Sequence, residues 1–412
     1  MTGARDEAQT GRALKIFVVA GEESGDRLGA ALMRAIRDRT RGGVTFAGVG
    51  GHAMQAGGLQ TLFPIEDIAI IGFAAVPQKL SVILRHLRET VAAVIAARPD
   101  ALVIIDSPDF THRVARRVRA AAPAIPIIDY VSPTVWAWRP GRARSMRGYV
   151  DHVLALLPFE PEAHARLGGP ACTYVGHPMI ESAAALRPNS EEMRRREQAP
   201  PVVLVLPGSR RTEIDRLLVV FGQAMSGVVQ QFGEVEPVLP TVPHLRAQIE
   251  ARTAAWALRP RIVVGAQEKS AAFRVARAAL AASGTVTLEL AMAGVPTVVA
   301  YKTSLIEEAV ARLMIKVPTI VLANLVLGEN VMPELVQRQA NPEQLAATLI
   351  PLLSDTAERR NQLQAFDRLD AVMGIGQVAP SENAAEIVID LARRGRDTAV
   401  AELPLLKADR AG

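Results

Sequence analysis

Two short glycine-containing motifs each follow an apolar run of strand length. The first, GEESGD, occupies residues 21–26 after the apolar residues 14–20, and the second, PGSR, occupies residues 207–210 after 202–206. A turn between a strand and a helix exposes unpaired N–H groups at the positive end of the helix dipole, where anions bind. Glycine lets the backbone approach such a ligand closely. Two such turns predict a ligand held across a cleft between two domains.

A carboxylate follows another predicted strand, in the segment IDSPD at 105–109. Parallel strands present reactive groups at their carboxyl ends, so Asp106 is a candidate general base that removes a proton from a hydroxyl. The alternative is that Asp106 or Asp109 caps the helix expected near Phe110. Both interpretations are compatible if Asp109 is the cap and Asp106 the base.

Two of the three tryptophans lie in one loop after a strand, YVSPTVWAWR at 130–139. Such a loop could stack Trp136 on a sugar ring, or its tryptophans could fill the edge of a domain. The arginines that begin with Arg139 suit a phosphate or a lipid headgroup, and they equally suit one solvated helix face.

A further strand-turn-helix pattern, SGTVTLE, occupies residues 283–289. Ser283 and Thr285 could bind phosphate at the helix start, and the carboxylate of Glu289 could accept hydrogen bonds from a ribose diol. The alternative is helix capping with Glu289 in solvent. With the guanidinium of Arg210 in the same half, the pattern favours a nucleotide site there.

Several other chemistries have no sequence signature. The chain has no Asp-x-Asp pair, no Walker A motif and no histidines at metal-ligand spacing. We therefore expect no metal and no cofactor.

The order of apolar runs and helical stretches predicts an α/β protein with two Rossmann-like domains and parallel sheets. Strands are expected at 14–20, 44–49, 101–105, 126–131, 153–157, 173–175, 202–206, 238–239, 261–264, 279–282 and 297–301. The expected division is a disordered tail (1–13), an N-terminal domain (14–180), a linker (181–200), a C-terminal domain (201–365), C-terminal helices that are candidates for packing back on the first domain (366–396) and a second tail (397–412).

Composition limits the number of domains, the cellular compartment and the kinds of partner that we expect. A chain of 412 residues that is 49% hydrophobic predicts about two domains with sizeable cores. The single Cys172 and the lack of a signal segment at the N-terminus indicate the cytoplasm. A net charge of +5 suits anionic partners, but aromatic residues are only 4%, which argues against nucleic acid.

The longest apolar stretch, residues 68–84, is interrupted by Pro77, Gln78 and Lys79 and is therefore not predicted to span a membrane. It is either a buried strand-turn-helix or a flap that contacts a membrane or acyl chains. The flap hypothesis places five side chains at the contact: Ile70, Ile71, Phe73, Val76 and Leu80.

Taken together and in this order, the motifs resemble those of the lipid-A-disaccharide synthases. The matching segments are VAGEESGD (19–26), IDSPDF (105–110), YVSPTVWAWR (130–139), LPFE (157–160), VGHPM (175–179), LPGSRRTEI (206–214), SGTVTLE (283–289) and NLVLGENVMPELVQ (324–337). The resemblance covers nearly the whole chain, and YVSPTVWAWR is its most specific part.

This resemblance implies a GT-B glycosyltransferase whose two domains face each other across a cleft. The donor would be UDP-2,3-diacylglucosamine and the acceptor 2,3-diacylglucosamine 1-phosphate. The products would be the β-1,6-linked disaccharide 1-phosphate and UDP. It also implies a peripheral protein on the cytoplasmic surface of the inner membrane; a homodimer that exchanges its C-terminal helices is left open.

The resemblance assigns a role to each candidate residue. Asp106 would deprotonate the acceptor hydroxyl for inverting attack. The acceptor side would comprise Glu22, Ser24, Gly25, Asp26, Trp136 and Arg139. The donor side would comprise Gly208, Ser209, Arg210, Glu213, Ser283, Gly284, Thr285, Glu289 and Asn324.

Overall fold

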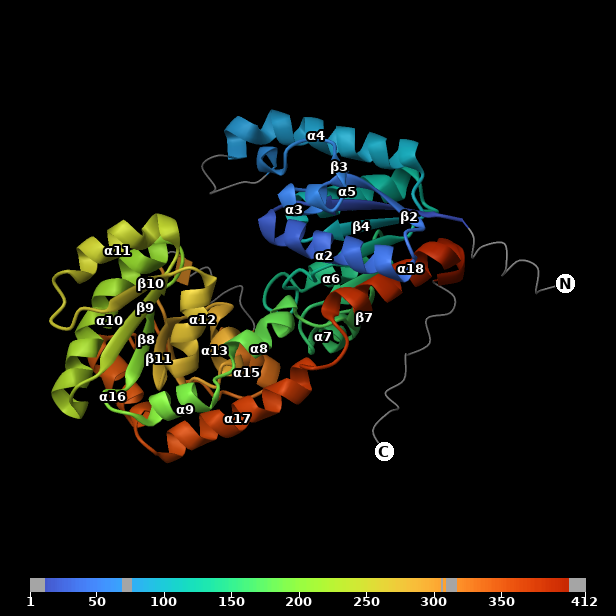
Figure 1. The fold of residues 1–412 in the computed structure, drawn as a ribbon. Coiled ribbons are helices and arrows are strands. Elements are labelled where there is room, and N and C mark those ends of the chain that lie inside the picture. The colour runs from blue at the N-terminus through green and yellow to red at the C-terminus, as the bar shows by residue number, and fades with distance from the viewer. Residues whose placement is uncertain (1–11, 69–75, 305–306, 309–316, 400–412) are drawn as a thin grey trace, which may run out of the picture. The chain divides into compact units, whose positions relative to one another are not determined.

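The computed structural model describes residues 12–68, 76–304, 307–308 and 317–399. The chain forms two compact units, of which the first runs through Pro178 and resumes at Val378, while the second spans Met179–Gln377 (Figure 1). Each unit is built around one sheet of parallel strands with flanking helices, so the predicted α/β class with two Rossmann-like domains is confirmed.

The sheet of the first unit has, among the described residues, the strand order β3-β2-β1-β4-β5-β6-β7. Its strands are β1 (Leu14–Ala20), β2 (Val44–Val49), β3 (Gln60–Thr61), β4 (Ala101–Ile105), β5 (Ile127–Tyr130), β6 (His152–Ala155) and β7 (Ala171–Tyr174). The order reverses between β1 and β4, which pair in parallel from Ile16 with Ala101 to Ala20 with Ile105. The carboxyl ends of these two strands therefore border the crevice where ligands bind in such sheets.

Helices cover both faces of this sheet, because right-handed crossovers that run in opposite directions along a sheet lie on opposite faces. The helix α2 (Glu23–Arg39) packs against α18 (Pro380–Ala399), and α4 (Val76–Ala97) packs against α5 (Pro108–Ala121) (Figure 1). The shorter helices are α3 (His52–Ala56), η1 (Ile65–Asp67), α6 (Gly141–Met146) and α7 (Glu160–Arg166). None of the helices in the described part of the chain is long and apolar enough to cross a bilayer.

The sheet of the second unit has the order β10-β9-β8-β11-β12-β13 among the residues described. Its strands are β8 (Val202–Leu206), β9 (Glu236–Thr241), β10 (Arg261–Val264), β11 (Ala278–Ala282), β12 (Thr297–Tyr301) and β13 (Glu334–Val336). Its helices are η3 (Pro178–Ser182), α8 (Ala183–Leu186), α9 (Ser190–Glu197), α10 (Arg211–Phe232), η4 (Pro243–Leu245), α11 (Arg246–Thr253), α12 (Ala266–Val275), α13 (Val286–Met292), α15 (Leu322–Leu327), α16 (Pro342–Leu353) and α17 (Ala357–Met373). Within the segment 366–396, α17 thus lies in the second unit and α18 in the first.

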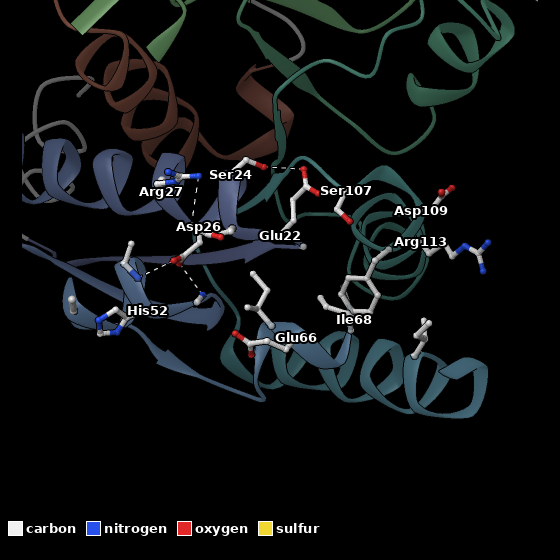
Figure 2. A pocket seen from close by; sticks show the side chains of 18 of the residues that line it. Glu22, Ser24, Asp26, Arg27, His52, Glu66, Ile68, Ser107, Asp109 and Arg113 are labelled. Atoms are coloured by element: carbon white, nitrogen blue, oxygen red, sulfur yellow. Dashed lines mark hydrogen bonds and ion pairs between the residues drawn. The ribbon is translucent and has the colours of Figure 1, made fainter. Parts of the chain in front are cut away.

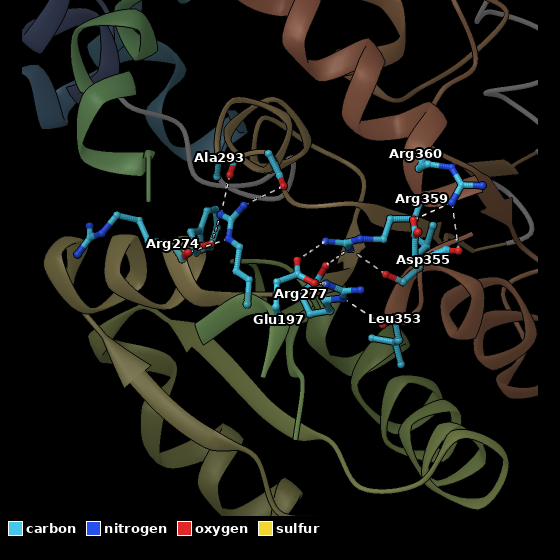
Figure 3. Close-up of polar contacts among 12 residues, drawn as sticks. Glu197, Arg274, Arg277, Ala293, Leu353, Asp355, Arg359 and Arg360 are labelled. Carbon is cyan, nitrogen blue, oxygen red and sulfur yellow. Dashed lines mark hydrogen bonds and ion pairs between the residues drawn. The ribbon is translucent and has the colours of Figure 1, made fainter. Parts of the chain in front are cut away.

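The segment 181–200 contains two short helices, α8 and α9, which pack on α12 of the second unit. Near the end of α9, the buried Arg196 donates hydrogen bonds to the carbonyls of Phe273, Arg274, Ala293 and Gly294. These carbonyls close α12 and α13, so one guanidinium satisfies the ends of two helices. Figure 3 shows Ala293 among these groups and Glu197 beside Arg277.

Candidate active site

A cavity of about 960 Å³ lies at the carboxyl ends of β1 and β4 in the first unit. Figure 2 shows Glu22, Ser24, Asp26 and Arg27 from the start of α2 on one side, and Ile68 with the carboxylate of Glu66 from η1 on the other. The apolar residues Ile65, Leu80 and Ile83 of η1 and α4 also line the cavity. The lining residues are Gly21, Glu22, Glu23, Ser24, Asp26, Arg27, Gly51, His52, Ala53, Ala56, Ile65, Glu66, Ile68, Leu80, Ile83, Ser107, Asp109, Phe110 and Arg113. The structure therefore brings three of the predicted acceptor residues, Glu22, Ser24 and Asp26, into one cavity.

Asp106 lies beside this cavity, directly after β4. Asp106 and Ser107 both have left-handed backbone conformations, with φ of 51° and 47°, which turns the chain sharply between β4 and α5. The Ser107 N–H donates to the Asp106 carboxylate at 2.7 Å, and the Ser24 hydroxyl lies 3.4 Å from its other oxygen. The same hydroxyl donates to Glu22 at 2.8 Å, so two carboxylates share one small polar cluster.

The cluster shifts the proton affinity of Asp106. Burial, followed by the hydrogen bond with Glu22, raises the pKa of Asp106 to about 6, while the Ser107 N–H acts in the opposite direction. A carboxylate in this range is mostly ionised at neutral pH and still has useful basicity, which is the property of a general base.

The turn after β4 depends on a glycine in the facing loop. A Cβ atom at Gly21 would lie 2.2 Å from the Cβ of Ser107, which is too close for any side chain. The first glycine of the GEESGD motif is therefore required so that the two loops can meet.

Of the two carboxylates expected near Asp106, Asp26 has a structural function and Asp109 lies in solvent. Asp26 is 2% exposed, and its carboxylate accepts backbone hydrogen bonds from Gly51, Ala53 and Met54 at 2.7–3.0 Å. It thereby anchors the start of α3, which forms one end of the cavity. The proposed capping role of Asp109 is wrong: Ser107 is the N-cap residue of α5, and Asp109 is exposed in the first turn.

The apolar side of the cavity lies only partly within the described residues. Ile68 is buried, Leu80 is 45% exposed, and both line the cavity. Ile70, Ile71 and Phe73 lie outside the described residues, as does the side chain of Val76. The prediction of a membrane or acyl contact therefore depends here on Leu80 and its described neighbours.

The remaining acceptor candidates do not line the cavity. Gly25 is buried against the Ile105 carbonyl, and Arg139 is exposed with its guanidinium 4.3 Å from the ring centre of Trp138. The indole of Trp136 donates to the buried Glu160 at 3.0 Å and packs edge-on against Phe159.

Glu160, the last residue of the LPFE motif, is a buried acid to which the sequence pattern assigned no role. Its second oxygen accepts from the N–H groups of Leu156 and Leu157, and burial raises its pKa to about 7. The tryptophan loop is thus held to the start of α7, which supports the interpretation that Trp136 fills a domain edge.

In the second unit, the PGSR motif closes β8 as predicted. Gly208 has φ of 112°, and a Cβ there would meet the Glu213 carboxylate at 2.3 Å. That carboxylate accepts from the N–H groups of Ser209 and Arg210 at 3.0 and 3.2 Å, whereas the Arg210 side chain is 81% exposed. Glu213 therefore occupies the N–H groups that were expected to receive an anion, and the Arg210 guanidinium remains accessible.

The SGTVTLE motif also forms a strand-turn-helix. The Ser283 hydroxyl donates to the Ile320 carbonyl at 2.8 Å, while Gly284 and Thr285 form the turn before α13. Glu289 forms an ion pair with Lys269 of α12, a partner that no sequence motif indicated. Asn324 is buried, and its amide is bonded to the backbone of Val331 and Met332, so the structure gives it a scaffolding function in the loop before β13.

Basic and imidazole side chains that the sequence motifs missed also line the cavity of the first unit: Arg27, His52 and Arg113. Of these three, only Arg27 directly follows one of the predicted site motifs, GEESGD. Among the described residues, no group of three or more His, Cys, Asp or Glu side chains is arranged to hold a metal ion.

The comparisons with known proteins bear on this geometry. The sequence profile of the family described as Lipid-A-disaccharide synthetase matches residues 16–388.

The chain belongs to the lipid-A-disaccharide synthetase family.

Curated proteins named lipid-A-disaccharide synthase match this chain over nearly their whole length. The Nitrobacter hamburgensis relative is 59% identical over 382 residues, covering 93% of this chain and 96% of that protein. One Rhodopseudomonas palustris relative is 56% identical over 394 residues, covering 95% of this chain and 100% of that protein. A more distant one from Rhodospirillum centenum is 44% identical over 381 residues. Membership of this synthetase family makes the chain a glycosyltransferase.

Solved structures of low identity share the fold of the lipid-A-disaccharide synthetase chain. Acinetobacter baumannii MurG has a TM-score of 0.53 at 15% identity and covers 92% of this chain and 99% of its own. Methanocaldococcus jannaschii UDP-GlcNAc 2-epimerase, solved with UDP-GlcNAc and UDP, has a TM-score of 0.54 at 13% identity and covers 92% and 100%. At this identity the likeness concerns the fold alone.

Proposed function

We propose that this chain is a lipid-A-disaccharide synthase that transfers 2,3-diacylglucosamine from UDP-2,3-diacylglucosamine to 2,3-diacylglucosamine 1-phosphate. The acceptor 6-hydroxyl loses its proton to Asp106 and attacks the anomeric carbon of the donor from the face opposite UDP. The new C–O bond forms as the bond to the diphosphate breaks, which inverts the configuration and gives the β-1,6-linked disaccharide 1-phosphate and UDP.

The observation that carries this proposal is a carboxylate with a raised pKa beside a cavity that is polar on one side and, apart from Glu66, apolar on the other. Asp106 has a pKa of about 6 and lies next to Ser24 and Glu22. Across the cavity, Ile65, Ile68 and Leu80 provide a surface suited to acyl chains. An acylated sugar needs both properties in one site.

The donor would bind in the second unit. The exposed Arg210 guanidinium would pair with the diphosphate, whose charge increases as the bond breaks. Glu289 would accept hydrogen bonds from the ribose diol, with Lys269 holding its second oxygen. Glu213 would have to release the Ser209 and Arg210 N–H groups if the diphosphate binds them.

We further propose that the protein associates with the inner-membrane surface on its cytoplasmic side, because both substrates are lipids that reside in a bilayer. Sedimentation with anionic vesicles would test this: a protein that stays in the supernatant at low salt contradicts it. The homodimer stays a prediction, and light scattering of the purified protein would give its mass in solution.

The test of the reaction is an assay in detergent micelles with both lipid substrates, read by UDP release and by the mass of the disaccharide. Wild-type protein should form both products, with and without a chelator. Asp106→Asn should lower kcat by about 10²–10⁴-fold, because a neutral amide cannot accept the proton. The control is Asp38→Asn, an exposed residue on α2 that should remain active.

Turnover of Asp106→Asn at the wild-type rate would show that the base lies elsewhere. If well-folded wild-type protein makes no disaccharide, the proposed function is wrong. The next assay would then be epimerisation of UDP-GlcNAc without acceptor.

A further inference from the structure

His86 lies behind the apolar side of the cavity, in the middle of α4, and is 4% exposed. Its Nδ1 atom is 3.0 Å from a carboxylate oxygen of Glu89, and its Nε2 atom is 3.2 Å from one of Asp67. Glu89 belongs to the same helix, but Asp67 is the last residue of η1. The imidazole therefore joins two elements that are separated in sequence.

The two contacts can join the elements only through a ring proton. An ionised carboxylate only accepts hydrogen bonds, so a ring nitrogen bonds to one only by donating. Which nitrogen donates depends on the tautomer, and a proton on Nε2 ties Asp67 of η1 to α4.

The ring also has a specific aromatic environment. It is stacked on Phe63 with ring centres 3.9 Å apart and an angle of 27° between the planes. Phe63 in turn meets Phe110 edge-on at 6.4 Å. Phe110 lines the cavity, so the aromatic contacts also connect His86 to the cavity, in addition to its contact with η1.

The segment that His86 holds has little backbone support of its own. The preceding strand β3 has two residues, and η1 has three. Yet Ile65, Glu66 and Ile68 from this segment line the cavity, and α4 contributes Leu80 and Ile83 to the same lining. The position of η1 against α4 therefore sets the shape of the apolar side.

We propose that His86 is a positioning residue that fixes η1 to α4 and thereby sets how the acyl chains of the lipid substrates fit the cavity. This inference rests on the proposed function. Its effect is on substrate fit, because His86 lies behind the lining residues and is not one of those that face the cavity.

The principal variant is His86→Phe, which keeps an aromatic ring on Phe63 and removes the contacts to Asp67 and Glu89. The KM for the diacylated acceptor should rise about tenfold while kcat stays within about twofold, since misplaced walls weaken binding more than the chemical step. UDP binding, measured by calorimetry, should be unchanged. The matched control is Arg85→Gln, an exposed neighbour on α4 that should leave KM unchanged.

A second variant covers the case in which His86→Phe does not fold. Asp67→Ala removes one partner at a half-exposed position, and its KM should rise in the same direction by a smaller factor.

Two outcomes would overturn the inference: an unchanged KM in folded His86→Phe, or a fall in kcat with KM unaltered. Failure of the proposed function would look different, because wild-type protein would then make no disaccharide.

Discussion

At the scale of single residues, the important feature is that Asp106 and Glu22 share the Ser24 hydroxyl. Asp106 could be predicted because a carboxylate at the end of a buried strand faces the crevice. The function of Asp26 could not: its partners are backbone N–H groups of residues 51–54, and only the folded chain brings them to its carboxylate.

The pair of carboxylates makes a prediction about pH. Glu22 raises the pKa of Asp106 through its hydrogen bond and its charge. The rate should therefore fall as pH drops through about 6, where Asp106 becomes protonated. Glu22→Gln removes the negative charge, so the pKa of Asp106 should fall, and the acid limb of kcat/KM should move to lower pH by about one unit. A limb that stays in place would belong to another group.

At the scale of elements, strands that form a clear apolar run could be predicted, and the shortest strands could not. The predicted bounds of β1, β2, β4, β8, β10 and β12 agree with the structure, and β10 is an edge strand, whereas the prediction for the interior strand β9 covered only residues 238–239. The strands β3 and β13, with two and three residues, lie at the sheet edges and were missed, because so short a stretch carries no periodic pattern.

The helix α9 shows why part of the segment 181–200 was difficult to interpret. Its charged residues suggested an amphipathic helix and a linker between the domains, but Arg196 binds four carbonyls that end α12 and α13. A run of arginines in sequence does not reveal which member is buried.

Removing the hydrogen bonds of Arg196 should lower the stability of the fold. Arg196→Met keeps the apolar stem but leaves these carbonyls without a donor, so the free energy of unfolding should fall by about 3 kcal/mol. Urea unfolding followed by circular dichroism would measure it. Arg194→Met, exposed on the same helix, is the control, and equal effects of the two variants would contradict the argument.

At the scale of the whole molecule, the chain returns to the first unit after completing the second. Residues from Val378 onward belong to the first unit, where α18 packs on α2, β1 and β4. Ion pairs from Arg39 to Glu382 and Glu386 add to this contact. The first unit therefore depends on residues at the far end of the sequence.

A substitution in α18 should accordingly destabilise the first unit. Val388 is fully buried, and Val388→Asp would place a charge in that core, lowering the free energy of unfolding by about 3 kcal/mol or more. Calorimetry should show a lower midpoint for one transition and an unchanged second one. Val378→Asp, at a position that is 52% exposed, is the control. A single transition that shifts as a whole would mean that the units unfold together.

The position of α18 also has a consequence for synthesis on the ribosome. The strands of the first unit emerge early, but α18, which covers α2 and β1, is the last of the described helices to be made. Until it is released, the nascent first unit exposes an apolar face, while the second unit already has every strand described for it. We expect the domain that is translated second to be the first to finish folding, and the domain that is translated first to be the one exposed to chaperones in the interval.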